Sequence, residues 1–209
     1  IQMAYTDAYL EKINAGKDLK IGMKNSACVA TQDIGDGELI FSVPIGECLE
    51  VEQGRKALSW MGSKPLGVLR TGDFGILALY LLQEKSAGTS SKYAEYIANL
   101  PTQPPGVLGW DDASVAELVQ STTRNVQGQL DAIESDWAVI EAGAKAAASS
   151  ALITNDMLTF ESFQWAFGVV KAYNLFIQGQ PILAPGVDAI QSDTYAESEA
   201  VVEGVGIWG

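Results

Sequence analysis

A missing residue type limits the chemistry that this sequence can perform, because none of its 209 residues is histidine. Catalytic triads that pair serine or cysteine with an imidazole base are therefore excluded. The two cysteines, Cys28 and Cys48, are well separated and form no CxxC pair. A structural zinc site needs about four ligands, so the sequence predicts no metal site and no disulfide framework. Chemistry is left to tyrosine, lysine, the carboxylates and the backbone.

The charge balance limits the partners. The chain has 26 acidic and 13 basic residues, a formal charge of -13. A field of this sign repels phosphate groups, which makes nucleic acid and anionic membrane surfaces poor partners. It favours basic protein surfaces or serves solubility, which is the commoner role of such a charge. The longest apolar stretches, such as Phe74 to Leu82, are far shorter than the roughly 20 residues of a transmembrane helix. The first residue is Ile1 rather than methionine, which is expected for a processed precursor or for part of a longer gene product.

The pattern of apolar residues predicts strands near the start of the chain and helices after them. Apolar residues at helical spacing predict a short helix from Tyr5 to Ala15. Alternating residues predict strands at Ala27–Thr31 and Glu38–Pro44, paired as a hairpin, with a third short strand at Cys48–Val51. The turn chemistry of residues 33–37 supports the hairpin.

A helical block follows these strands. It is expected to contain a helix with its N-cap at Thr71 or Asp73, a short second helix, a long region broken by glycines and a final helix before a strand-forming tail from Gly179. The predicted ranges are Asp73–Glu84, Ser91–Asn99, Asp111–Ala148 and Thr159–Asn174. The helices at Asp73–Glu84 and Thr159–Asn174 have the widest apolar faces of the four, so we expect these two to pack together. The order predicts an α+β fold with helices inserted between two parts of one sheet system.

Several phrases of the sequence resemble one family. They are Val29–Ile34 with Gly37–Pro44, Leu77–Glu84 with Lys92–Ile97 and Leu100-Pro101, Phe163–Val170, and Ile182–Asp188. The first pair of segments resembles the opening hairpin of a SET domain, and the second group resembles the helical insert of the Rubisco large-subunit lysine methyltransferase type. Phe163–Val170 resembles the last helix of that insert, and Ile182–Asp188 resembles the return to the SET core. The resemblance covers nearly the whole chain.

The resemblance implies a SET-like β-strand core interrupted by a helical insert. It divides the chain into an N-terminal hairpin region at 1–52, a helical insert at 53–178 and a return to the core at 179–209. The return is expected to be incomplete, with the C-terminal part of the core lying beyond Gly209.

The family transfers a methyl group from S-adenosylmethionine to protein lysines, typically in plastids, and the resemblance implies where its cofactor motifs fall. A Gly-x-Gly turn approaches the cofactor, an arginine and an Asn-His pair hold it, and a late tyrosine orients the lysine. The two glycine positions fall on Asn25 and Ala27, and the arginine position falls on Tyr173. The Asn-His pair falls on Gln191-Ser192, whereas Asp188 is kept. The late tyrosine is expected beyond the end of the sequence. Unpaired cofactor groups cost ~1–3 kcal/mol each, so binding in the family's usual way is expected to fail.

Two functions from different classes follow. One is a non-catalytic structural or interaction subunit of a larger plastid assembly, for example a photosynthetic complex in the stroma or on the stromal face of the thylakoid, without a cofactor. The alternative is a divergent lysine methyltransferase that binds S-adenosylmethionine in a rearranged site. A peripheral association with a membrane complex is compatible with the first.

Single residues keep two interpretations each. Asp188 is either a retained cofactor contact or the turn former expected after Pro185-Gly186. Tyr173 either covers the vacated pocket or ends a core helix. The proline-restricted loop from Pro101 to Trp110 offers Leu108 and Trp110 as an interface, unless Trp110 folds back onto the helices.

Overall fold

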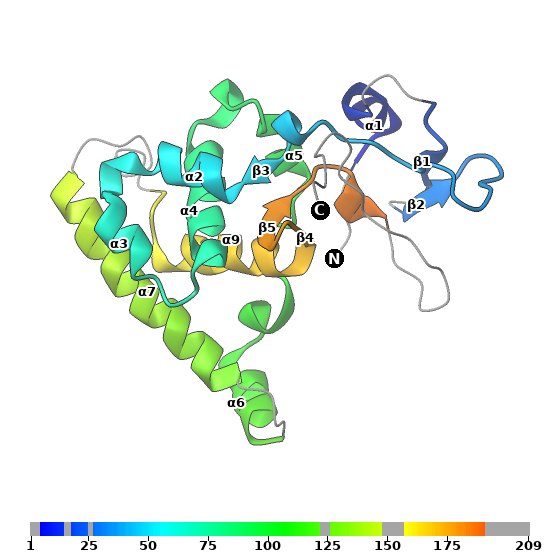
Figure 1. The fold of residues 1–209 in the computed structure, drawn as a ribbon. Helices are drawn as coiled ribbons and strands as arrows, with labels where there is room; N and C mark the ends of the chain where they lie inside the picture. Colours follow the sequence, from blue (N-terminus) through cyan, green and yellow to red (C-terminus); the bar gives the residue numbers. More distant parts are fainter. Residues whose placement is uncertain (1–4, 15–17, 25–26, 122–125, 148–156, 191–209) are drawn as a thin grey trace, which may run out of the picture.

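A computed structural model describes residues 5–14, 18–24, 27–121, 126–147 and 157–190 of the chain (Figure 1). Its α-helices are α1 Asp7–Ile13, α2 Val51–Ala57, α3 Ser63–Gly67, α4 Asp73–Ser86, α5 Ala94–Asn99, α6 Asp112–Ser121, α7 Val126–Ala147 and α9 Phe160–Tyr173. Its strands are β1 Ile21–Lys24, β2 Ala27–Ala30, β3 Leu49–Glu50, β4 Asn174–Ile177 and β5 Gln180–Leu183. None of the helices within these residues is long and apolar enough to cross a membrane.

The core is built around α4 and α9, which pack on one another as the sequence predicts. Every residue of α4 from Gly75 to Leu82 is buried, because apolar side chains occupy nearly all of its faces. The predicted N-caps were wrong: the helix is capped by Gly72. That residue has φ 59 and ψ -131, a conformation that glycine adopts and residues with a Cβ avoid.

The start of α9 follows from a capping box. The Thr159 hydroxyl accepts a hydrogen bond from the Ser162 backbone N–H at 3.2 Å, and the Ser162 hydroxyl accepts one from the Thr159 N–H at 3.0 Å. The helix then buries the predicted apolar face, which includes Phe163, Phe167 and Val170.

Two distant parts of the chain meet in one three-stranded antiparallel sheet of order β3-β5-β4. Leu49 of β3 and Asn174 of β4 both face Leu183 of β5. The helices therefore interrupt a sheet, as the α+β prediction requires. Strand structure resumes at Asn174, directly after α9 and before the boundary expected at 179.

The predicted hairpin partner was wrong. β2 pairs with β1, in a register that places Ile21 opposite Ala30. Residues 38–44, which had been predicted to form the second strand, contain no strand. The segment has no strand partner: Leu39 is 47% exposed, and the Ser42 N–H donates to Asn14 Oδ1 at 2.9 Å. Phe41 and Val43 still pack their side chains against the two apolar clusters.

The region predicted as a broken helix forms α6 and α7, but two of its glycines are not breaks. Gly128 and Gly143 both lie inside α7. A Cβ on Gly143 would come within 2.9 Å of Met61, so the small residue allows close packing on the preceding segment. The buried Asp136 of α7 accepts hydrogen bonds from the backbone N–H groups of Arg70 at 2.6 Å and Thr71 at 2.9 Å, which fixes the approach to α4.

Candidate functional site

The structure brings together two of the five predicted cofactor positions. Tyr173 is the last residue of α9, and Asp188 lies in a short 3₁₀ turn, Val187–Ala189. Burial raises the pKa of Tyr173, and the charge of Asp188 raises it further, so the two side chains interact electrostatically. Ala27 lies in β2, whereas Asn25 and Gln191 are outside the described residues.

A glycine turn presents Asp188. Gly186 has φ +82, and a Cβ there would come within 2.8 Å of Phe41 Cζ and 2.9 Å of Ile13 Cδ1. Only glycine fits this left-handed, closely packed position. Asp188 is therefore part of a turn, in agreement with the turn-former interpretation.

Both carboxylate oxygens of Asp188 are hydrogen-bonded to tyrosines. Tyr5 donates its hydroxyl to Oδ1 at 2.8 Å, and Tyr96 of α5 donates its hydroxyl to Oδ2 at 3.1 Å. Tyr5 and Tyr96 are themselves buried. We call Asp188 and these two tyrosines, with Tyr9, the tyrosine cluster.

Burial sets the protonation of the tyrosine cluster. Desolvation raises the pKa of Asp188 to about 7, although the hydrogen bonds from Tyr5 and Tyr96 oppose the shift. Desolvation also raises the pKa of Tyr5 and of Tyr96, and the nearby charge of Asp188 adds to both shifts. The phenols therefore stay protonated as donors, while the carboxyl can gain or lose a proton near neutral pH.

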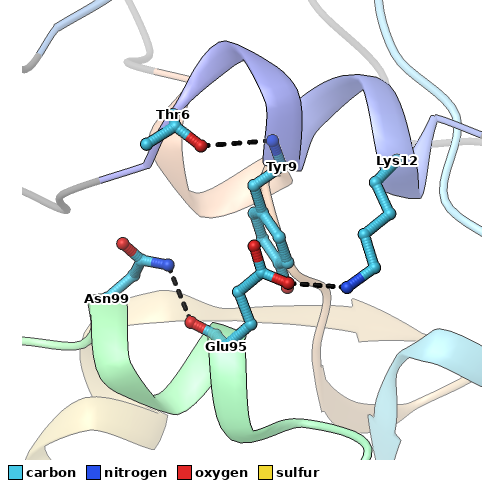
Figure 2. A network of polar contacts seen from close by, with 5 residues as sticks. All are labelled: Thr6, Tyr9, Lys12, Glu95 and Asn99. Carbon is cyan, nitrogen blue, oxygen red and sulfur yellow. Dashed lines mark hydrogen bonds and ion pairs between the residues drawn. The ribbon is translucent and has the colours of Figure 1, made fainter.

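Helix α1 completes the tyrosine cluster and is held on α5 (Figure 2). Tyr9 stacks on Tyr5 with ring centroids 5.5 Å apart, and its pKa is raised by burial and then by the charge of Glu95. At the exposed rim, Lys12 Nζ lies 2.6 Å from Glu95 Oε2. The Thr6 hydroxyl accepts from the Tyr9 N–H at 3.2 Å and begins α1. The tyrosine cluster thus connects α1, α5 and the turn after β5.

Sequence reasoning missed Tyr5 and Tyr96. Their partner Asp188 lies 183 and 92 residues away along the chain, so no local spacing links the three. The retained Asp188 was the one signal that pointed to this place. Among the described residues no group of three or more acidic or cysteine side chains is arranged to hold a metal ion.

The cysteines and the predicted interface lie outside the tyrosine cluster. Cys28 and Cys48 are both free, and burial raises the pKa of Cys48 to about 12, which suppresses thiolate reactivity. The two predicted interface residues differ: Leu108 is half-buried against the core, whereas Trp110 is 51% exposed. Trp110 is not among the side chains that pack against the core.

Comparisons with known proteins place the fold. No family model matches the chain, and no curated protein matches it. The SET domain of LSMT bound to lysine and AdoHcy matches at 19% identity with a TM-score of 0.66, covering 90% of this chain and 42% of that one. Rubisco LSMT bound to AdoMet matches at 18% identity with a TM-score of 0.65, covering 90% of this chain and 43% of that one. The complex of Rubisco LSMT with sinefungin and monomethyllysine matches at 19% identity with a TM-score of 0.67, covering 92% of this chain and 45% of that one.

These matches show that the chain has a SET methyltransferase-like fold and resembles the Rubisco LSMT structures. The chain spans less than half the length of each matched chain, which agrees with a partial SET core.

Proposed function

We propose that this SET-like chain is a non-catalytic interaction subunit. One observation carries the proposal: the motif position that keeps the family's residue, Asp188, has both carboxylate oxygens engaged by Tyr5 and Tyr96. A carboxylate committed to internal hydrogen bonds has to give them up before it can hold a ligand, and breaking each one costs about 2 kcal/mol.

The replaced motif positions support the same proposal. In the resemblance, Asn25 and Ala27 stand where the family has glycines, so a Cβ occupies the place where backbone approaches the cofactor. Tyr173 stands for an arginine and Gln191 for an asparagine. Burial and the neighbouring Asp188 raise the pKa of Tyr173, which keeps its phenol neutral where the family supplies a positive charge.

The setting that we propose is a plastid assembly, such as a photosynthetic complex, at the stroma or the stromal face of the thylakoid. Support comes from the resemblance to a Rubisco-modifying family. The test is a full-length fluorescent fusion in plant cells together with sedimentation of fractionated chloroplasts. Co-sedimentation with a large stromal or thylakoid complex is expected, and a uniform cytosolic signal would overturn this part of the proposal.

The second candidate is a divergent protein-lysine methyltransferase. It is favoured by the fold likeness over 90% of the chain to a protein bound to lysine and AdoHcy. The two functions differ in whether the chain binds AdoMet.

The deciding experiment is thermal unfolding with excess AdoMet or sinefungin, with ATP as the control nucleotide. A ligand at a hundredfold over its dissociation constant stabilises the native state by about 2.7 kcal/mol. We expect no rise in melting temperature with any of the three. A rise with AdoMet and sinefungin but not with ATP supports the methyltransferase and contradicts our proposal.

A further inference from the structure

A surface hollow of about 540 Å³ lies beside the exposed Trp110. Its walls come from the end of the proline loop and from one face of α6. The lining residues are Gly109, Trp110, Asp111, Ser114, Glu117 and Leu118. An exposed tryptophan beside a hollow offers a large apolar ring and a polar N–H to a partner.

The loop that presents Trp110 is fixed to α9. The Trp165 indole N–H donates to the Pro101 carbonyl at 2.7 Å, and a Cβ on Gly168 would lie 3.2 Å from Pro105. Inside the loop, a Cβ on Gly109 would lie 2.2 Å from the Pro104 oxygen, so the chain folds tightly on itself there. A fixed loop loses little conformational entropy when it binds a partner.

The charged residues that line the hollow, Asp111 and Glu117, are both acidic. From Pro101 to Ser121 the sequence contains Asp111, Asp112 and Glu117 but no lysine or arginine. Asp111 accepts from the Ser114 N–H at 3.0 Å and from its hydroxyl at 2.9 Å, and these bonds lower the pKa of Asp111 and keep it ionised. No lysine or arginine in the described part of the chain forms an ion pair with Asp111 or Glu117.

We propose that this hollow, the Trp110 groove, binds a basic segment of a protein partner. An arginine or lysine of that segment stacks on the Trp110 indole, and Glu117 pairs with its charge. An adjacent apolar side chain of the segment contacts Leu118. The inference rests on the proposed function only in taking the chain as an interaction subunit, and its test needs no cofactor.

Charge selects this occupant over a second copy of the chain. Each copy carries a formal charge of -13, so two copies repel one another, whereas a basic segment is attracted before contact. The combination of an aromatic anchor with a carboxylate matches the arginine-rich composition of interface hot spots.

The test is fluorescence anisotropy with a short labelled peptide of alternating arginine and leucine, and a glutamate–leucine peptide as the negative probe. The groove variants are Trp110→Ser and Glu117→Lys. Each has a matched control outside the groove. Phe176→Ser removes an aromatic side chain that is 62% exposed on β4. Glu11→Lys makes the same charge change at an exposed residue of α1, a helix that lies far from α6 (Figure 1).

We expect the arginine–leucine peptide to bind, and each groove variant to weaken it about tenfold while the controls change it about twofold at most. Equal weakening by Glu117→Lys and Glu11→Lys would mean attraction by overall charge alone and would overturn the proposal. So would unchanged binding by both groove variants.

Sedimentation of the free chain identifies self-association. A dimer that Trp110→Ser breaks would assign the groove to a second copy of the chain instead. Circular dichroism checks each variant's fold, and Glu117→Lys carries the test if Trp110→Ser unfolds.

Discussion

The interface of α4 with α9 and the tyrosine cluster stabilise the same fold in different ways. Between the helices the contacts are made by apolar side chains such as Leu79, which is 0% exposed, and Phe167, which is 3% exposed. In the tyrosine cluster, one carboxyl receives hydrogen bonds from phenols of two segments. The first region depends on volume and close packing, whereas the second depends on the protonation of Asp188.

The largest expected effect is on the helical interface. Leu79→Ala or Phe167→Ala removes a buried apolar side chain and leaves a cavity, which costs about 2–5 kcal/mol of unfolding free energy. Urea unfolding followed by circular dichroism measures the loss, and it should be the same at pH 5 and pH 8 relative to wild type. Val68→Ala, at a residue 63% exposed, is the control. Near-neutral effects at both core sites would contradict the packing described here.

A buried carboxylate in the helical region gives a sharper comparison. Asp136→Ala leaves the backbone N–H groups of Arg70 and Thr71 without their acceptor. We expect a loss of about 2 kcal/mol of unfolding free energy. Each unmade hydrogen bond to a charged group costs about that much, but water partly reaches the two freed N–H groups, so the two losses do not add in full. Glu134→Ala, at an exposed site of the same helix, is the matched control in the same urea experiment. A loss no greater than that of the control would show that Asp136 does not fix the loop.

The tyrosine cluster should make stability depend on pH. The pKa of Asp188 is about 7 in the folded chain, against about 3.9 for an unfolded aspartate. Between these values the folded state holds a proton that the unfolded state has lost. The contribution is therefore complete below about pH 4 and is lost as pH rises toward 7, at up to about 1.4 kcal/mol per pH unit.

Asp188→Asn isolates this contribution. The amide cannot ionise, so the variant should gain stability relative to wild type as pH rises from 5 to 7, and the difference should be constant above that. Urea unfolding across this range measures it, with Asp36→Asn in an exposed turn as the control for net charge. Tyr96→Phe removes a hydrogen bond that lowers the pKa of Asp188, and should move the wild-type transition to higher pH. Parallel pH profiles for wild type and Asp188→Asn would contradict the cluster's role.

The same contrast explains what could be predicted from the sequence. Helices α1, α4 and α9 follow from the spacing of apolar residues within a few turns, so their existence and the packing of α4 on α9 were predicted correctly, whereas the N-cap of α4 was not. The strand predicted at 38–44 failed because alternation shows only that a segment suits a sheet, and β2 already has β1 as its partner. β1 itself was missed because Gly22 interrupts its short apolar pattern.

The tyrosine cluster could not be predicted, because its geometry depends on the tertiary fold. Asp188 was identified through the family resemblance, yet nothing near it in sequence indicates Tyr5 or Tyr96. Tyr173 ends a core helix, as one of its two interpretations predicts, and that it covers a vacated pocket stays a prediction.

The smallest expected effect separates the two residues of the predicted interface. Leu108 packs partly against the core, whereas Trp110 projects beside the groove with 51% of its surface exposed. Trp110→Ser should therefore change the unfolding free energy by about 0.5 kcal/mol or less, the usual range for surface substitutions. Leu108→Ser should cost about 1–2 kcal/mol, because it removes part of a buried apolar surface. Urea unfolding of the two single variants, rather than the double variant, distinguishes the contributions. Since a tryptophan buried in the core would cost about 3–5 kcal/mol on truncation, a loss of that size at Trp110 would place it in the core and remove the anchor of the groove.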